Sequence, residues 1–245
     1  MLSGIREVLI ITNPKDKKFF RELLGNGNQW GMKIDYVIQK EPAGLPQAYI
    51  LGQKFLSNQR SALILGDNIF YGNELVSKIL LADKLEKASI FAYRTKNPER
   101  YGVIKLNKNN NPTSIEEKPK KPKSNLAITG LYLFDEDAPL YSKDLKPSKR
   151  GELEITDLIK KYLSNKSLNV EILGRGFAWL DTGTFENMLD ASSFIKTIQE
   201  RQGLIIASPD EIAFNNNWID DKKLIENSNL ILNNDYKNYL LSLIN

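Results

Sequence analysis

The sequence predicts an α/β fold in which helices flank a Rossmann-like, mixed but mostly parallel sheet. Short apolar runs rich in β-branched residues, such as residues 7–12 and 61–65, are typical of buried strands. Helical stretches alternate with these runs, and that alternation indicates βαβ units. The length of 245 residues suits one sizeable α/β core, so we expect a single domain over 1–245.

The elements follow from local signals taken in chain order. Asn13-Pro14 ends the first strand, and the glycine- and asparagine-rich segment 25–31 predicts a turn. Strands are expected at 7–12, 33–39, 61–65, 88–94, 128–134, 169–173 and 177–180, with a hairpin of 101–106 and 112–118. Helices are expected at 15–24, 45–55, 73–81, 153–163 and 184–200, and two more, at 220–226 and 234–243, in a helical tail from about 208 to 245.

Histidine and cysteine are both absent from the sequence. A Ser-His-Asp triad, a Cys-His dyad, a disulfide and a histidine- or thiolate-ligated zinc site are therefore excluded. Any metal must be bound through oxygen, and acid-base work must use carboxylates, lysine, tyrosine or water. Phosphoryl transfer suits this inventory, because positioning and electrostatics carry most of its catalysis.

No apolar run is long enough to span a membrane, and the N-terminal residues do not resemble a signal peptide. We therefore expect a cytoplasmic protein without a membrane partner. The net charge of +4 raises the question of nucleic-acid binding. The densest basic run, residues 118–123, is interrupted by prolines and has no interleaved aromatic residues, so we expect no nucleic-acid partner.

Two aspartates follow strand-like segments about a hundred residues apart. Asp67 comes shortly after the apolar run 62–65, and Asp181 directly follows residues 178–180. Carboxylates at the carboxyl ends of strands lie where open α/β sheets bind ligands. Two converging carboxylates suit Mg²⁺, which takes its remaining ligands from phosphates and water. The simpler alternative for Asp67 is a turn residue that caps a helix.

The pair Glu117-Lys118 lies at the end of a predicted strand, before Pro119. A lysine there supplies a point charge for a phosphate. The alternative is a solvated charge run, which is the usual explanation for such strings.

These motifs, in this order, resemble the sugar nucleotidyltransferases, and within them the members that act on dTTP and glucose 1-phosphate. The resemblance covers nearly the whole chain. The matching segments are 39–48, 65–68, 101–103, 116–119, 129–132, 150–157, 174–184, 199–203 and 209–214.

The resemblance implies a nucleotide-diphospho-sugar transferase fold, a homo-oligomer (a tetramer in this family) and the reaction of dTTP with glucose 1-phosphate to give dTDP-glucose and pyrophosphate. It assigns Asp67 and Asp181 to Mg²⁺, with Asp67 and Lys118 as the catalytic residues. It implies nucleotide contacts for Gln39, Gly44 and Asp67, and sugar-phosphate contacts for Tyr101, Gly102, Glu117, Lys118 and Thr129.

One departure from the family pattern concerns phosphate binding. Family members begin with a strand and a glycine-rich loop that wraps the triphosphate with backbone N–H groups. These 245 residues contain neither that loop nor that first strand. Two alternatives to an enzyme therefore stay open. One is a non-catalytic subunit that keeps the fold and a sugar-phosphate pocket, and the other is a plain sugar-binding module. Preference for dTTP over UTP also stays open, since thymine and uracil differ by one methyl group.

Overall fold

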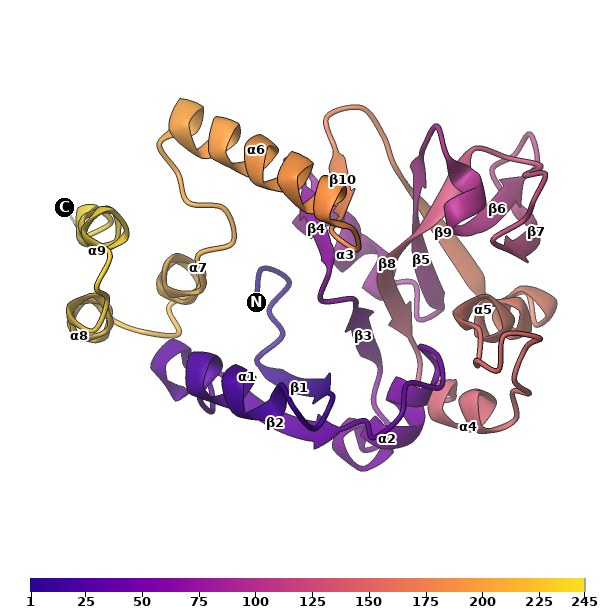
Figure 1. Cartoon of the computed structure of the whole chain (residues 1–245), viewed down its shortest axis with the longest axis horizontal. Coiled ribbons are helices and arrows are strands. Elements are labelled where there is room, and N and C mark those ends of the chain that lie inside the picture. The colour runs from indigo at the N-terminus through magenta and orange to yellow at the C-terminus, as the bar shows by residue number, and fades with distance from the viewer. Residues whose placement is uncertain (245) are drawn as a thin grey trace. The chain divides into compact units, whose positions relative to one another are not determined.

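Strand β8 (Leu126–Phe134) is the centre of the main sheet, and every one of its residues is buried. In this computed structural model, which describes residues 1–244, β8 pairs with β5 (Ala88–Arg94) along one edge (Figure 1). The opposite edge is shared by β6 (Gly102–Leu106), which pairs with residues 126–127, and β3 (Ser61–Ile64), which pairs with residues 131–134. The sheet therefore splits between β3 and β6, beside residues 128–130.

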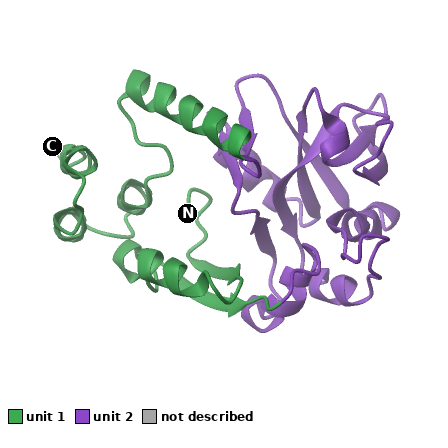
Figure 2. Ribbon diagram, in the orientation of Figure 1, with its two compact units in different colours: residues 1–40, 185–245 green, residues 41–184 purple. Residues whose placement is uncertain are grey.

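The chain divides into two compact units (Figure 2). Unit 2, residues 41–184, holds the six-stranded sheet, in which the order is β7-β6-β8-β5-β9 with β3 also on β8, and a separate antiparallel pair of β4 and β10. Its other elements are α2 (Gln47–Leu56), β4 (Asn68–Tyr71), α3 (Leu75–Asp83), η2 (Pro98–Arg100), β7 (Pro112–Glu117), α4 (Ala138–Lys143), α5 (Ile155–Ser164), β9 (Leu168–Leu173) and β10 (Ala178–Asp181).

Alternating side chains of unit 2 build one core on each face of its sheet, as the two-residue period of a strand requires. On one face, Ile90 and Phe134 pack with Leu158 and Tyr162 of α5. On the other face, Phe91 packs with Ala82 of α3 and residues from β8 and β9. Burial on both faces explains why the central strands are nearly continuous apolar runs in the sequence.

Unit 1 combines residues 1–40 with the residues from 185 onward. Its elements are β1 (Glu7–Thr12), α1 (Lys17–Leu24), η1 (Asn28–Trp30), β2 (Lys33–Ile38), α6 (Phe185–Gln202), α7 (Pro209–Asn215), α8 (Asp221–Asn229) and α9 (Asn234–Ser242). β1 and β2 form a two-stranded parallel sheet. A small core around Leu224 and Leu240 holds α7, α8 and α9, and the Asn227 side chain links α8 to the Gln29 carbonyl oxygen of η1 at 2.8 Å.

The mixed α/β class is confirmed, but the prediction of a mostly parallel sheet is wrong. Among the described residues, β1 with β2 and β5 with β9 are parallel, and the other five pairings are antiparallel. The physical reason lies between β5 and β8. No crossover helix separates them, only the turn η2 and the β6–β7 hairpin, and parallel neighbours need a long crossover.

Most predicted elements lie within one or two residues of their observed bounds. Three short strands or α-helices were not predicted, β4, α4 and α7, and neither were the 3-10 helices η1 and η2. The prediction of one domain over 1–245 stays a prediction. Among the described residues, no helix is long and apolar enough to cross a membrane.

Candidate active site

The β4–β10 pair brings Asp67 and Asp181 to one place in unit 2. Asn68 is the register partner of Asp181, so Asp67 lies just beyond the end of the ladder. Thr182 holds the two segments together, because its backbone N–H and its hydroxyl both donate to the Asp67 carbonyl oxygen, at 2.8 and 2.9 Å. Both aspartates lie at strand ends as predicted, although β3, which precedes Asp67, is antiparallel to its neighbour β8.

The two carboxylates converge on Gly183. A Cβ placed on this glycine would lie 2.9 Å from Asp181 Oδ1 and 3.7 Å from Asp67 Oδ2. The two oxygens are therefore no farther apart than the sum of these distances. The Gly183 N–H also donates to Asp181 Oδ1 at 2.9 Å. A side chain at position 183 would fill the space between the carboxylates.

The side chain of Asn68 links Asp67 to β8 and to β10. Its Nδ2 donates to Asp67 Oδ1 at 2.8 Å. Its Oδ1 accepts from Trp179 Nε1 at 2.6 Å and from the Gly130 N–H at 3.0 Å. Gly130 lies beyond the β3 and β6 ladders; its carbonyl oxygen accepts from the Leu65 N–H at 2.9 Å, and the side chain of Asn68 takes the place of a strand partner for its N–H. Asn68 lies in the matching segment 65–68, but the sequence predicted no role for it.

Tyr101 and Arg100 lie on the other oxygen of Asp181. The Tyr101 hydroxyl donates to Asp181 Oδ2 at 3.2 Å, and its ring packs edge-on against Trp179 with centroids 4.8 Å apart. Burial raises the pKa of Tyr101, and the Asp181 charge raises it further while Arg100 opposes. Arg100 Nη2 is 4.0 Å from Asp181 Oδ2. Within residues 1–244 no third acidic, histidine or cysteine side chain completes a metal cluster.

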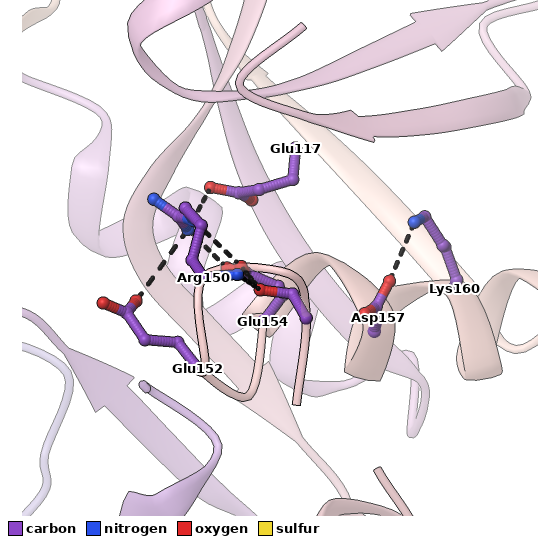
Figure 3. Close-up of polar contacts among 7 residues, drawn as sticks. Glu117, Arg150, Glu152, Glu154, Asp157 and Lys160 are labelled. Atoms are coloured by element: carbon purple, nitrogen blue, oxygen red, sulfur yellow. Dashed lines mark hydrogen bonds and ion pairs between the residues drawn. The ribbon is translucent and has the colours of Figure 1, made fainter. Parts of the chain in front are cut away.

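Glu117 and Lys118 lie at the end of β7. Glu117 faces Arg150 at 3.6 Å, and Arg150 is held in turn by both carboxylate oxygens of Glu154 (Figure 3). Burial raises the pKa of the Glu117 carboxyl despite the nearby cations Lys118 and Arg150. Lys118 has a left-handed backbone, with φ of 39°, and its N–H donates to the Tyr101 carbonyl oxygen at 3.1 Å. Such backbone geometry in a non-glycine residue is sparsely populated and clusters at functional sites.

Gly102 lies beneath Glu117, where a Cβ would come within 2.8 Å of Thr156 Cγ2 and 3.5 Å of Glu117 Oε2. The β6–β7 hairpin therefore brings together Tyr101, Gly102, Glu117 and Lys118, and Tyr101 connects this group to Asp181. Arg150, which completes the charge cluster, was not selected from the sequence as a site residue. It lies in a loop, and only the fold places that loop against β7.

The three remaining predicted residues have different surroundings. The Thr129 hydroxyl is fully buried and donates to the Phe91 carbonyl oxygen at 2.8 Å, so it is occupied within the core. Gly44, with φ of +100°, packs on the backbone of Leu153, whose carbonyl oxygen would be 2.0 Å from a Cβ at this position. Gln39 directly follows β2 in unit 1, and its N–H donates to the Thr12 carbonyl oxygen at 2.8 Å.

Comparison with known proteins gives a consistent group of relatives. A family described as nucleotidyl transferase matches residues 1–198. A glucose-1-phosphate thymidylyltransferase of Neisseria meningitidis is 50% identical over 100% of this chain and 85% of its own length. A protein of the same name from Mycolicibacterium smegmatis is 45% identical, again over 100% of this chain and 85% of its own length.

Solved structures agree on the fold. A Bacillus anthracis protein assigned as a glucose-1-phosphate thymidylyltransferase, in complex with sucrose, has a TM-score of 0.71 at 35% identity, covering 77% of this chain and 76% of its own. A UDP-glucose pyrophosphorylase in complex with UDP-glucose has a TM-score of 0.70 at 23% identity, covering 80% and 83%. The nucleotide-diphospho-sugar transferase fold implied by the motifs is confirmed.

Proposed function

This chain belongs to the nucleotidyl transferase family, and we propose that it catalyses the transfer of a thymidylyl group from dTTP to glucose 1-phosphate. The products are dTDP-glucose and pyrophosphate. The observation that carries the proposal is the convergence of the Asp67 and Asp181 carboxylates beside Gly183. Relatives aligned with the full length of the chain carry the name of this enzyme, which favours it over a non-catalytic subunit or a sugar-binding module.

The donor set fits Mg²⁺. Asp67 and Asp181 offer carboxylate oxygens to one point, and such hard ligands suit this ion, which usually takes one or two carboxylates and completes its shell with phosphate and water. Asp67 and Asp181 would hold the ion, and when bound it would neutralise charge on the α-phosphate of the nucleotide.

The hairpin residues position the second substrate. Lys118 binds the phosphate of glucose 1-phosphate and brings it close to the nucleotide despite their like charges. Glu117 accepts a hydrogen bond from a sugar hydroxyl, and Gly102, whose Cβ position is closed by Thr156, contacts the sugar through its backbone. An oxygen of the sugar phosphate attacks the α-phosphorus in line, a new P–O bond forms, and the bond to the β-phosphate breaks so that pyrophosphate leaves. No covalent enzyme intermediate is required.

Nucleotide contacts of Gln39 and of Gly44 stay proposals from the resemblance. A glutamine amide offers both a donor and an acceptor to the edge of a pyrimidine. The methyl group that separates thymine from uracil is worth only about 1–3 kcal/mol of discrimination, so we expect measurable activity with UTP. The tetrameric state and the cytoplasmic location stay predictions from the resemblance and the composition.

The test is pyrophosphate release from dTTP and glucose 1-phosphate. It should be run on the 245-residue chain and on a version extended at its N-terminus with the family's strand and glycine-rich loop. We expect release that requires both substrates and stops when EDTA removes the divalent cation. Release from dTTP alone, or release unaffected by EDTA, would refute the proposal.

A further inference from the structure

Arg100 is a positively charged residue at the site to which the proposed mechanism gives no role. It ends the turn η2, and its Nη2 lies 4.0 Å from Asp181 Oδ2, which is too long for a hydrogen bond but close enough for a charge contact. Its guanidinium lies 5.7 Å from the centre of the Tyr101 ring. The side chain is 42% exposed, so a ligand in solution can reach it.

This arrangement is unfavourable for a divalent cation on its own. The described residues provide only two carboxylates at this place, and a guanidinium stands beside one of them. A cation bound between Asp67 and Asp181 would be repelled by Arg100. A phosphate group removes both defects, because its oxygens supply missing metal ligands and its negative charge is attracted to the guanidinium.

We propose that Arg100 couples metal binding to phosphate binding at this site. It lowers the affinity of the Asp67–Asp181 pair for a bare divalent cation, and it binds an anionic phosphate that arrives with the cation. The inference rests on the proposed function, since it takes the two aspartates as the metal ligands. The phosphate belongs to the nucleotide or pyrophosphate rather than to the sugar, whose phosphate is assigned to Lys118.

A merely structural role for Arg100 makes the opposite prediction. If Arg100 only held Asp181 and Tyr101 in place, its removal would weaken metal binding. If it repels the cation, its removal strengthens metal binding and at the same time weakens phosphate binding. The two roles therefore differ in the sign of a measured change.

The experiment measures binding and needs no turnover. The affinity for Mn²⁺ is determined from the concentration of free Mn²⁺, measured by electron paramagnetic resonance. The affinities for pyrophosphate, dTTP and glucose 1-phosphate are measured separately by calorimetry at saturating Mn²⁺. For Arg100→Gln we expect Mn²⁺ alone to bind about three- to tenfold more tightly, as for removal of a partly exposed charge. We expect pyrophosphate and dTTP to bind about tenfold more weakly, with glucose 1-phosphate unchanged.

Three further variants serve as controls. Arg100→Lys keeps the charge, so its Mn²⁺ affinity should stay close to that of the unmodified protein. Arg60→Gln removes the same charge from an arginine that contacts Asp83 at 3.1 Å, and it should change none of the affinities. Asp181→Asn tests the proposed function itself, and it should remove most Mn²⁺ binding.

The outcomes separate the two ideas. Weaker or unchanged Mn²⁺ binding in Arg100→Gln, or unchanged pyrophosphate and dTTP affinity, overturns the coupling role while Asp181→Asn still confirms the metal site. A larger loss for glucose 1-phosphate than for pyrophosphate overturns the assignment of the phosphate. Unchanged Mn²⁺ binding in Asp181→Asn overturns the metal site on which both proposals stand.

Discussion

Strands β8 and β1 have similar apolar sequences but different surroundings. β8 has partners on both edges and side chains packed on both faces, and all of it is buried. β1 pairs only with β2 among the described residues, and only Thr12 of its six residues is buried. A run of apolar residues thus identifies a strand, but burial depends on how many neighbours the fold supplies. The candidate catalytic carboxylates are held in unit 2, which contains β8.

The largest expected effect concerns the phosphate-binding loop that these residues do not contain. We expect the 245-residue chain to release pyrophosphate at least about a thousandfold more slowly than a version extended with the family's strand and glycine-rich loop. A single well-placed donor can be worth 10²–10³ in rate, and these residues contain no such loop. The added strand should also raise the melting temperature, since an unpaired edge invites rearrangement. Equal rates would show that another segment binds the triphosphate.

The next effect concerns the proposed metal ligands Asp67 and Asp181 in unit 2. In the extended form, Asp181→Asn should lower turnover by about a thousandfold at matched Mg²⁺, because the loss of metal charge stabilisation amounts to several kcal/mol. The fold should be unaffected, since the amide oxygen still accepts the Gly183 N–H. Asp83→Asn, at an exposed aspartate paired with Arg60, is the control. Near-normal turnover in Asp181→Asn would remove this residue from the metal site.

Stability measurements compare the two regions directly. Leu158→Ala leaves a cavity under the main sheet at a fully buried position and should cost about 2–5 kcal/mol of unfolding free energy. Ile10→Ala in the partly exposed β1 should cost about 1 kcal/mol. Urea denaturation of both variants gives the comparison. A larger loss for Ile10→Ala would mean that β1 is buried in solution by a partner that the described residues do not supply.

A smaller effect is expected at Lys118. Lys118→Ala should weaken glucose 1-phosphate binding by about 1.5–3 kcal/mol, the value of a charge-assisted contact, with little change for dTTP. Lys123→Ala removes an exposed lysine from the same segment, where it pairs with Glu116 at 2.6 Å, and should change neither. Calorimetry on the extended form measures the two ligands separately. Equal losses of binding free energy for glucose 1-phosphate and dTTP would show that Lys118 does not contact the sugar phosphate specifically.

The smallest effect concerns Glu117. Because burial raises the pKa of this carboxyl in the folded state, the folded protein binds its proton more tightly than the unfolded chain. Glu117 therefore contributes to the unfolding free energy below the pKa that its carboxyl has in the unfolded chain. This contribution is lost as the pH rises through the pKa of the carboxyl in the folded protein. Glu117→Gln should flatten that decline in urea titrations at acidic pH. An unchanged slope would mean that Arg150 and Lys118 fully offset the burial.

The sequence predicts long elements well because each carries its own periodicity. It did not predict β4, which has only four residues and forms by pairing with β10, more than a hundred residues away in the chain. It also missed α7, although Ser208 caps this helix by accepting from the Glu211 N–H and Pro209 follows it, both of which are local start signals. α4 was missed as well, although Asp137 occupies its N-cap position and Pro139 lies in its first turn, because this helix has only six residues.

The site shows the same division. Asp67 and Asp181 were predicted because strand ends are visible in the sequence. The roles of Asn68 and Arg100 were not, because they depend on contacts with Trp179 and Asp181 that only the fold creates. Thr129 was assigned from resemblance alone, and its hydroxyl is occupied in the core.

The β4–β10 ladder also determines how late in folding and synthesis the site forms. Thr182 and Asp67 are 115 positions apart in the chain, and Trp179 and Asn68 are 111 apart. Contacts of such separation form late, because the entropy of closing a long loop is lost before the contacts compensate for it. On the ribosome, Asp67 emerges long before its partner strand has been synthesised. The two carboxylates therefore stay apart until most of the chain has been made, so a nascent chain has no carboxylate pair to hold the proposed metal ion.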